Sequence, residues 1–264
     1  MMIAIVATII LTLLLIFICN LNENFTFSDI KKINLIDKIV WINLNRSVNR
    51  RAYMEDMLNK LNVKNERISG IDGKFVDVEK LVKNIKRREG LSLSEIACTL
   101  SHIKAINSLK NQEGKYFMVC EDDITLDNLQ YFKNIDLKKV IEKCPDFDIL
   151  ILHKFSNFQK NLDQDYTLWN KRIYSTACYI VSKNGVNKLI NNCEYVNDLN
   201  FKFKNDEEFN VADYYLYNLM NTWVYKYNII NTKDEDSTIH DSHLKFQKNS
   251  NKFNLDLILK NVNL

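Results

Sequence analysis

Three consecutive carboxylates near the middle of the 264-residue chain are the residues best placed to do chemistry. Residues 116–120 are rich in strand formers and too short for an ordinary helix, and they lead directly into Glu121, Asp122 and Asp123. Because side chains alternate along an extended chain, Glu121 and Asp123 are predicted to share one face while Asp122 points to the other. Adjacent carboxylates repel each other, and a hard divalent cation such as Mg²⁺ or Mn²⁺ takes oxygen ligands of this kind. An acidic turn after a strand is the alternative interpretation.

A second group of candidates lies where an expected strand meets an expected helix. Residues 38–44 are an apolar strand pattern, and helical spacing follows at once. Arg46 and Arg50 fall at this junction, where helix amides and guanidinium groups bind anions such as phosphate. Asn43 lies near the end of this strand pattern, and Asp72 follows the next one. The sequence therefore predicts an anion-binding junction.

A histidine lies on the helix expected over residues 94–110. His102 shares a face with Glu95 and Cys98, away from the apolar stripe. A single histidine on a helix is more often structural than catalytic. Glu95 beside it favours a functional role.

Strand and helix patterns alternate along the chain. Further strands are expected at 148–153, 173–182 and 223–230, and helices at 128–143, 183–192 and 211–221. Polar segments at 156–169 and 194–210 are expected to be loops. This alternation predicts an α/β domain with a mostly parallel central sheet, whose ligands bind beyond the carboxyl ends of the strands. The candidate residues at strand ends, Asn43, Arg46, Asp72 and 121–123, would all meet at that edge.

Composition excludes several classes of protein. The net charge of +3 is spread along the chain without a basic arm, which argues against a nucleic-acid partner. The six cysteines show no paired spacing, so neither a zinc site nor a disulfide framework is indicated.

The N-terminal segment is distinct from the rest of the chain. Residues 1–19 carry no charged side chain, and roughly 20 apolar residues suffice for a membrane-spanning helix. The segment lacks the basic start of a cleaved signal peptide. The expected organisation is therefore a transmembrane anchor over 1–19, a stem over 20–36 and a catalytic domain over 37–264. This predicts a single-pass membrane protein with a lumenal catalytic domain, as in the endoplasmic reticulum or Golgi, or a virion or host-membrane protein if it is viral.

Seven short segments, in this order, resemble glycosyltransferase family 25, the lipooligosaccharide and procollagen galactosyltransferase group. They are INLNRSVNR at 42–50, IDG at 71–73, SEIACTLSH at 94–102, CEDD at 120–123, ACYIVSKNGVNKL at 177–189, VAD at 211–213 and DSTI at 236–239. The resemblance implies a GT-A-like nucleotide-sugar-binding domain. It also implies transfer of a hexose, galactose or glucose, from a UDP-sugar to a hydroxyl of a glycan or protein acceptor, including a collagen-like one, with inversion at the anomeric carbon.

The resemblance also implies roles for individual residues. Asp123 and Glu121 would hold Mn²⁺ or Mg²⁺ with His240 completing the shell, and Asp213 would be the catalytic base. The residues implied to contact the nucleotide sugar are Asn43, Arg46, Arg50, Asp72, His102, Glu121 and Asp122. A helix-capping acid is the alternative for Asp213, and a solvated tail histidine is the alternative for His240.

The chain departs from the family pattern at two glycine positions, which are occupied by Ser94 and Ala97. Asn45 also replaces an aspartate of the opening motif. The glycine losses motivate an alternative function, in which the protein is a catalytically inactive family member. It would then act as a membrane-anchored module that binds a glycan or another protein.

Overall fold

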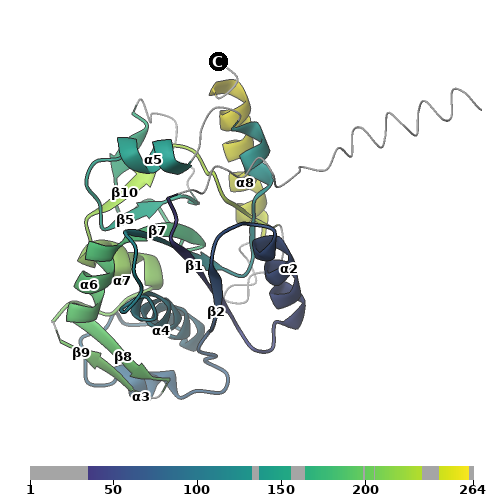
Figure 1. Cartoon of the computed structure of the whole chain (residues 1–264). Helices are drawn as coiled ribbons and strands as arrows, with labels where there is room; N and C mark the ends of the chain where they lie inside the picture. Colours follow the sequence, from purple (N-terminus) through teal and green to yellow (C-terminus); the bar gives the residue numbers. More distant parts are fainter. Residues whose placement is uncertain are drawn as a thin grey trace, which may run out of the picture. The chain divides into compact units, whose positions relative to one another are not determined.

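The computed structural model describes residues 35–132, 137–155, 164–198, 200–204, 206–233 and 244–261. Within them a seven-stranded sheet has the order β2-β1-β3-β7-β5-β10-β6 (Figure 1). Its strands, in chain order, are β1 Lys38–Asn43, β2 Asn65–Ser69, β3 Tyr116–Glu121, β5 Ile149–Ile151, β6 Tyr166–Leu168, β7 Cys178–Ser182 and β10 Thr222–Tyr225. The strands β2, β1, β3, β5 and β10 run in one direction, and β7 and β6 run in the other. The predicted α/β fold with a mostly parallel central sheet is therefore confirmed.

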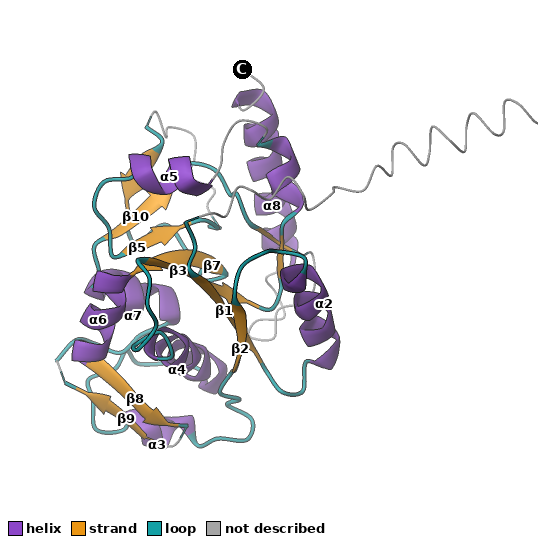
Figure 2. Ribbon diagram, viewed as in Figure 1, coloured by secondary structure: helices purple, strands orange, loops and turns teal. Residues whose placement is uncertain are grey.

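Helices cover both faces of this sheet (Figure 2). They are α2 Val48–Asn59, α3 Val78–Val82, α4 Leu93–Asn107, α5 Leu137–Lys143, α6 Lys183–Asn192, α7 Ala212–Leu219 and α8 Leu244–Asn261, with a 3-10 helix η3 at Asp127–Tyr131. The connection through α2 runs from β1 outward to β2, and the connection through α4 runs back past β1 to β3. Because parallel crossovers are right-handed, these two connections place α2 and α4 on opposite faces.

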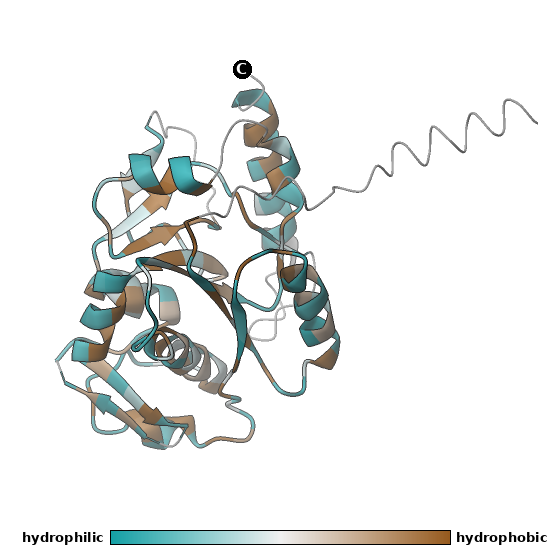
Figure 3. Ribbon diagram, viewed as in Figure 1, coloured by the Kyte–Doolittle hydropathy of each residue, from teal (hydrophilic) through white to brown (hydrophobic). Residues whose placement is uncertain are grey.

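The core on the α4 side is built from alternate residues of the strands. Val40 and Ile42 of β1 and Phe117 and Val119 of β3 are buried together with the apolar side of α4. Figure 3 shows the strands of the sheet as mostly hydrophobic and the helices as mixed along their length. This packing fixes the carboxyl ends of β1 and β3 next to α4.

The start of α4 is defined by a capping box. The Ser92 hydroxyl accepts a hydrogen bond from the Glu95 backbone N–H at 3.2 Å, and the Glu95 carboxylate accepts one from the Ser92 N–H at 2.8 Å. The reciprocal bonds satisfy two otherwise unpaired donors of the first turn. Glu95 therefore caps the helix, while its helix neighbour His102 pairs with a residue of β3.

The structure corrects the predicted transmembrane helix and, with it, the single-pass membrane localisation and lumenal placement. Among the residues described, none of the helices combines the length and the apolar character needed to cross a bilayer. The segment on which that prediction was based, residues 1–19, lies outside the described part of the chain, as does most of the predicted stem.

The two polar segments expected as loops both contain strands, so these predictions were wrong; β6 lies at the end of 156–169. Much of the segment 194–210, expected as a loop, is a hairpin of β8 Cys193–Asn197 and β9 Asn200–Phe203. Its aromatic side chains pack on one another, with Phe201 next to both Tyr195 and Phe203. The polar tail forms the long helix α8, which lies against η3 and the short strand β11 Asn231–Thr232, itself paired with β4 Ile124–Thr125.

Gly73 allows the loop after β2 to pack directly on the start of α4. A Cβ atom at this position would lie 2.7 Å from the carbonyl oxygen of Leu93, the first residue of α4. A side chain here can be accommodated only if backbone moves.

We expect Gly73→Ala to lower the free energy of unfolding by about 1–3 kcal/mol, because the added methyl group overpacks this contact. Urea denaturation followed by circular dichroism measures the change. Lys74→Ala is the matched control, because Lys74 is exposed in the same turn, and such surface changes cost at most about 0.5 kcal/mol. Equal stability of the two variants would contradict the packing argument.

Candidate functional site

The carboxylate of Asp122 is held by side chains from β1 and α2. The Asn43 side-chain amide donates to Asp122 Oδ2 at 2.6 Å, and Arg50 Nη1 donates to Oδ1 at 3.0 Å. Burial raises the pKa of Asp122, although the hydrogen bond from Asn43 and the charge of Arg50 oppose that rise. The alternation along β3 predicts that Asp122 needs partners of its own, and the structure supplies these two.

Arg67 on β2 holds Asn43, the partner of Asp122, in place through hydrogen bonds. Its Nε donates to Asn43 Oδ1 at 2.9 Å, and its Nη2 donates to Asn45 Oδ1 at 2.5 Å. Sequence reasoning missed Arg67. The available signal was the parallel pairing of β1 with β2, which puts Arg67 opposite Trp41, two residues before Asn43.

Glu121 points to the opposite face of the sheet, toward α4. Its Oε1 accepts a hydrogen bond from the Thr176 hydroxyl at 2.8 Å and lies 3.3 Å from His102 Nε2. The other ring nitrogen, Nδ1, lies 3.0 Å from the Tyr179 hydroxyl. Burial acts to raise the pKa of Glu121, but the hydrogen bond and charge of His102, together with Thr176 and His153, lower that pKa overall. Glu121 is thus a stabilised carboxylate.

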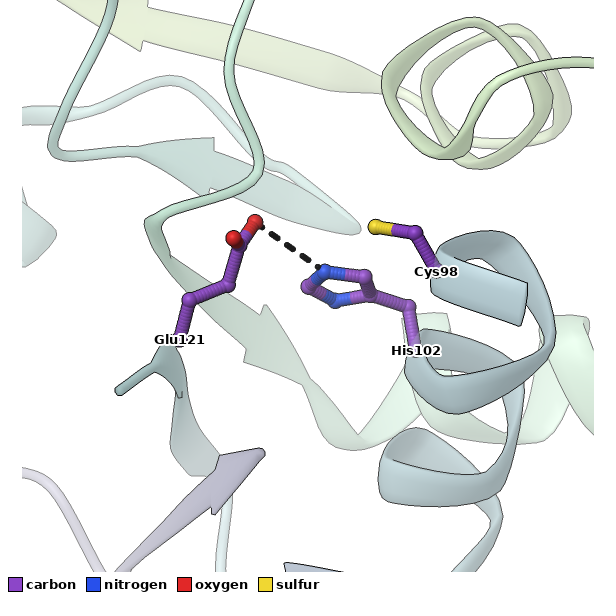
Figure 4. A group of neighbouring side chains, drawn as sticks. All are labelled: Cys98, His102 and Glu121. Carbon is purple, nitrogen blue, oxygen red and sulfur yellow. Dashed lines mark hydrogen bonds and ion pairs between the residues drawn. The ribbon is translucent and has the colours of Figure 1, made fainter. Parts of the chain in front are cut away.

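Cys98 lies one helical turn before His102 and faces the same carboxylate (Figure 4). Single ligand atoms of Cys98, His102 and Glu121 all lie within 4.8 Å of one another, so the group could hold a metal ion. Neither Thr176 nor Tyr179 was a predicted site residue, because their role depends on which strand becomes the neighbour of β3.

Asp123 is held differently from its two neighbours. The chain turns after Glu121, and the main-chain oxygen of Asp123 accepts a hydrogen bond from the Lys233 N–H at 2.7 Å. Its Oδ1 is buried and has no hydrogen-bond partner in the part of the chain that the structure describes. Burial, followed by the charge of Glu121, raises the pKa of Asp123 to about 7. A cation at this oxygen would supply the missing partner, and carboxylate oxygens are the ligands that Mg²⁺ and Mn²⁺ take. The third predicted ligand, His240, lies outside the described residues.

Asp213 lies in the first turn of α7, next to a strained loop. Its Oδ2 accepts a hydrogen bond from the Ser175 N–H at 3.3 Å, and its Oδ1 accepts one from the Tyr214 N–H at 2.9 Å. Burial is the main cause that raises the pKa of Asp213. Ser175 has a φ of 121°, a conformation that residues other than glycine rarely adopt and that often marks functional sites.

The pocket at the carboxyl ends of β1 and β3 brings predicted residues from four segments together. The predicted residues that line it are Arg46, Asp72, His102, Glu121 and Asp122. Arg46 Nε and Asp72 Oδ2 form an ion pair at 2.6 Å on its rim. Asn43 and Arg50 contribute through Asp122, whereas Asp123 and Asp213 are not part of the lining.

Residues 36–207 match the sequence profile of "Glycosyltransferase family 25 (LPS biosynthesis protein)". The chain is also 23% identical over 177 residues to a "Glycosyltransferase 25 family member" of Drosophila melanogaster. It is 25% identical over 176 residues to "Procollagen galactosyltransferase 2" of Mus musculus and 24% identical over 176 residues to the Homo sapiens protein of the same name.

These alignments cover part of each protein. They span 59% of this chain and 28% of the Drosophila protein, and 58% of this chain and 27% of the mouse protein. The chain therefore matches just over a quarter of the length of these curated relatives. The matched profile contains the carboxylates 121–123 and ends before Asp213.

The raised pKa of Asp123 predicts a pH dependence of stability in protein freed of divalent cations with a chelator. Between the ordinary pKa of 3.8 and about 7, folded Asp123 keeps a proton that the unfolded chain releases. Stability is therefore lost as pH rises through this window, with a slope of at most about 1.4 kcal/mol per pH unit from this group. We expect Asp123→Asn to remove this loss, so that its free energy of unfolding increases relative to wild type with rising pH. Urea denaturation at a series of pH values measures both curves, and parallel curves would contradict the prediction.

Proposed function

The chain belongs to glycosyltransferase family 25, and on this basis we propose that it transfers a hexose from a UDP-sugar to a hydroxyl of a glycan or protein acceptor. One observation carries the proposal. Side chains from four family-like segments, spread over residues 46–122, line a single pocket at the carboxyl edge of the sheet. That edge is where open α/β sheets bind their ligands.

The nucleotide diphosphate is proposed to bind at the junction of β1 and α2. Ser47, the N-cap of α2, makes no side-chain cap hydrogen bond, and the first turn of the helix has no acidic residue. The amide groups of this helix end are therefore not occupied by a side chain of the cap. Arg46 is on the pocket wall and Arg50 is one turn into the helix. Both guanidinium groups are paired with carboxylates, Arg46 with Asp72 and Arg50 with Asp122, and with the helix amides they are the groups proposed to contact the diphosphate.

Asp123 and Glu121 are the residues proposed to hold a divalent ion, Mn²⁺ or Mg²⁺, together with His240 of the tail. When bound, the ion neutralises charge on the leaving diphosphate. Asp122 does not compete for this role, because Asn43 and Arg50 occupy its two oxygens. It keeps the end of β3 in place instead.

Galactose is the first candidate for the transferred sugar and glucose the second. The mouse and human relatives are named procollagen galactosyltransferases. By that likeness, the acceptor proposed for this chain is a collagen-like protein or a glycan with an accessible hydroxyl.

The proposed transfer inverts the anomeric carbon. The acceptor oxygen bonds to that carbon as the bond to the diphosphate breaks, and UDP departs with the bonding electrons. Asp213 takes the acceptor proton. The burial that raises the pKa of its carboxylate makes it a better base near neutral pH. The amide N–H groups of Ser175 and Tyr214 fix its orientation.

The inactive alternative, a glycan- or protein-binding module, rested on the lost glycines at 94 and 97. Ala97 is buried at 4% exposure in the pocket wall, so its methyl group is accommodated in the packing between α4 and the loop at Gly73. This favours the enzyme over the inactive module.

Release of UDP tests the proposal. We expect the purified chain to release UDP from UDP-galactose or UDP-glucose in the presence of Mn²⁺, and to stop when the metal is chelated, because the diphosphate is a poor leaving group without charge neutralisation. A coupled UDP assay measures the rate. Failure with both donors, together with binding of an acceptor glycan or peptide, would favour the inactive module.

Asp213→Asn separates the base from the donor site. We expect it to lower kcat about 10²–10⁴-fold, because the acceptor proton loses its base. The affinity for UDP should stay within about twofold of wild type, since a tenfold change would require ~1.4 kcal/mol. Asp127→Asn is the matched control, since Asp127 is an exposed carboxylate. An unchanged kcat in Asp213→Asn would rule out the assigned role.

A further inference from the structure

The α4 side of the pocket contains a ligand set that differs from the one proposed for the catalytic metal, because it includes a thiol. It combines the thiol of Cys98, the imidazole of His102 and the carboxylate of Glu121 (Figure 4). The spacing of four residues along α4 puts Cys98 and His102 on one face of the helix, and Glu121 approaches from the end of β3.

Two of these side chains are oriented by neighbours that leave a ligand atom directed at the centre of the group. The Tyr179 hydroxyl lies 3.0 Å from His102 Nδ1, so Nε2 is the nitrogen that faces Glu121. The Thr176 hydroxyl donates to Glu121 Oε1. Such partners hold ligating side chains in place in metal sites and fix the histidine tautomer.

The spacing of the ligand atoms fits zinc after a small contraction. A tetrahedral zinc ion with ordinary bond lengths holds its S, N and O ligand atoms about 3.4–3.6 Å apart. The three atoms here lie within 4.8 Å of one another, and His102 Nε2 and Glu121 Oε1 are 3.3 Å apart. Movement of the Cys98 thiol by roughly 1 Å therefore completes three ligands and leaves the fourth position open.

We propose that Cys98, His102 and Glu121 bind one zinc ion, at a site distinct from the proposed Mn²⁺ or Mg²⁺ position at Asp123 and sharing Glu121 with it. The thiolate sets the selectivity, because sulfur and imidazole ligands favour zinc, whereas Mn²⁺ and Mg²⁺ favour oxygen. Among the described residues, this is the group in which at least three His, Cys, Asp or Glu side chains lie close enough together to hold one metal ion. The buried pair Cys120 and Cys178, with sulfurs 3.4 Å apart, has no comparable third ligand within the described part of the chain.

Shared use of Glu121 makes zinc an inhibitor. A zinc ion on this side withdraws Glu121 from the oxygen-ligand site and His102 from the pocket wall. Zinc is therefore expected to slow donor turnover even when Mn²⁺ is in excess. This consequence rests on the proposed function, whereas zinc binding itself does not.

Cobalt titration of the full chain, without nucleotide, tests the site. Co²⁺ reports a thiolate ligand through a charge-transfer band in the near ultraviolet and tetrahedral geometry through its visible bands. We expect one equivalent to bind with both signatures and to be displaced by Zn²⁺. The thiolate band should be lost in Cys98→Ser and Cys98→Ala, and the affinity should fall at least tenfold in His102→Gln.

Cys144→Ala is the matched control, because Cys144 is another partly exposed cysteine; the band should persist in it. Thermal melts establish that each variant is folded. Absence of the thiolate band in wild type, or its persistence in either Cys98 variant, overturns the site.

Inhibition is read separately, from the Zn²⁺ concentration that halves UDP release. This Zn²⁺ concentration should be at least tenfold higher for Cys98→Ser than for wild type. Equal values for the two proteins would contradict the proposal that zinc competes for Glu121. If UDP is never released, the proposed function fails while the cobalt result still decides the zinc site.

Discussion

The buried contact between Asp122, Asn43 and Arg50 is the constraint on which the site depends. It joins the carboxyl ends of β1 and β3 to the first turns of α2, and Arg67 extends it to β2. A partly buried charge pair of this kind is stable only while all its partners are present. It fixes the direction in which the chain leaves β3. Glu121 is thereby directed to the α4 face, and Asp123 follows in the turn.

The two remaining carboxylates differ in how their charge is compensated. Glu121 has His102 and Thr176 as partners, and its pKa is lowered despite burial. Asp123 has a buried oxygen without a hydrogen-bond partner in the described chain, and its pKa is raised. A divalent cation proposed at Asp123 would compensate the second of these carboxylates. The zinc proposal concerns Glu121, the compensated carboxylate, which together with His102 faces the thiol of Cys98.

Local sequence patterns predicted the elements that hold the site, because a strand followed by carboxylates or a helix stripe is encoded within a few residues. The sheet, α2, α4 and the position of 121–123 follow from such patterns. The brace by Arg67 and the contact of Thr176 with Glu121 depend on which strands become neighbours, which no local pattern states. Glu95 was expected beside His102, but its carboxylate is used in the capping box of α4. His102 pairs with Glu121 instead. The helix α8 could not be predicted from an apolar stripe, because its buried positions include Asn251 and Asn254 in place of apolar residues.

The carboxyl edge of this sheet is proposed to bind a nucleotide diphosphate through a metal. Isothermal titration of UDP into wild-type protein and into Asp123→Asn, each with Mn²⁺ and each with a chelator, tests it most directly. We expect binding to wild type that weakens at least tenfold, ~1.4 kcal/mol, on removal of the metal, and no metal effect in Asp123→Asn. Binding of equal strength in all four titrations, or no binding in any, would contradict it.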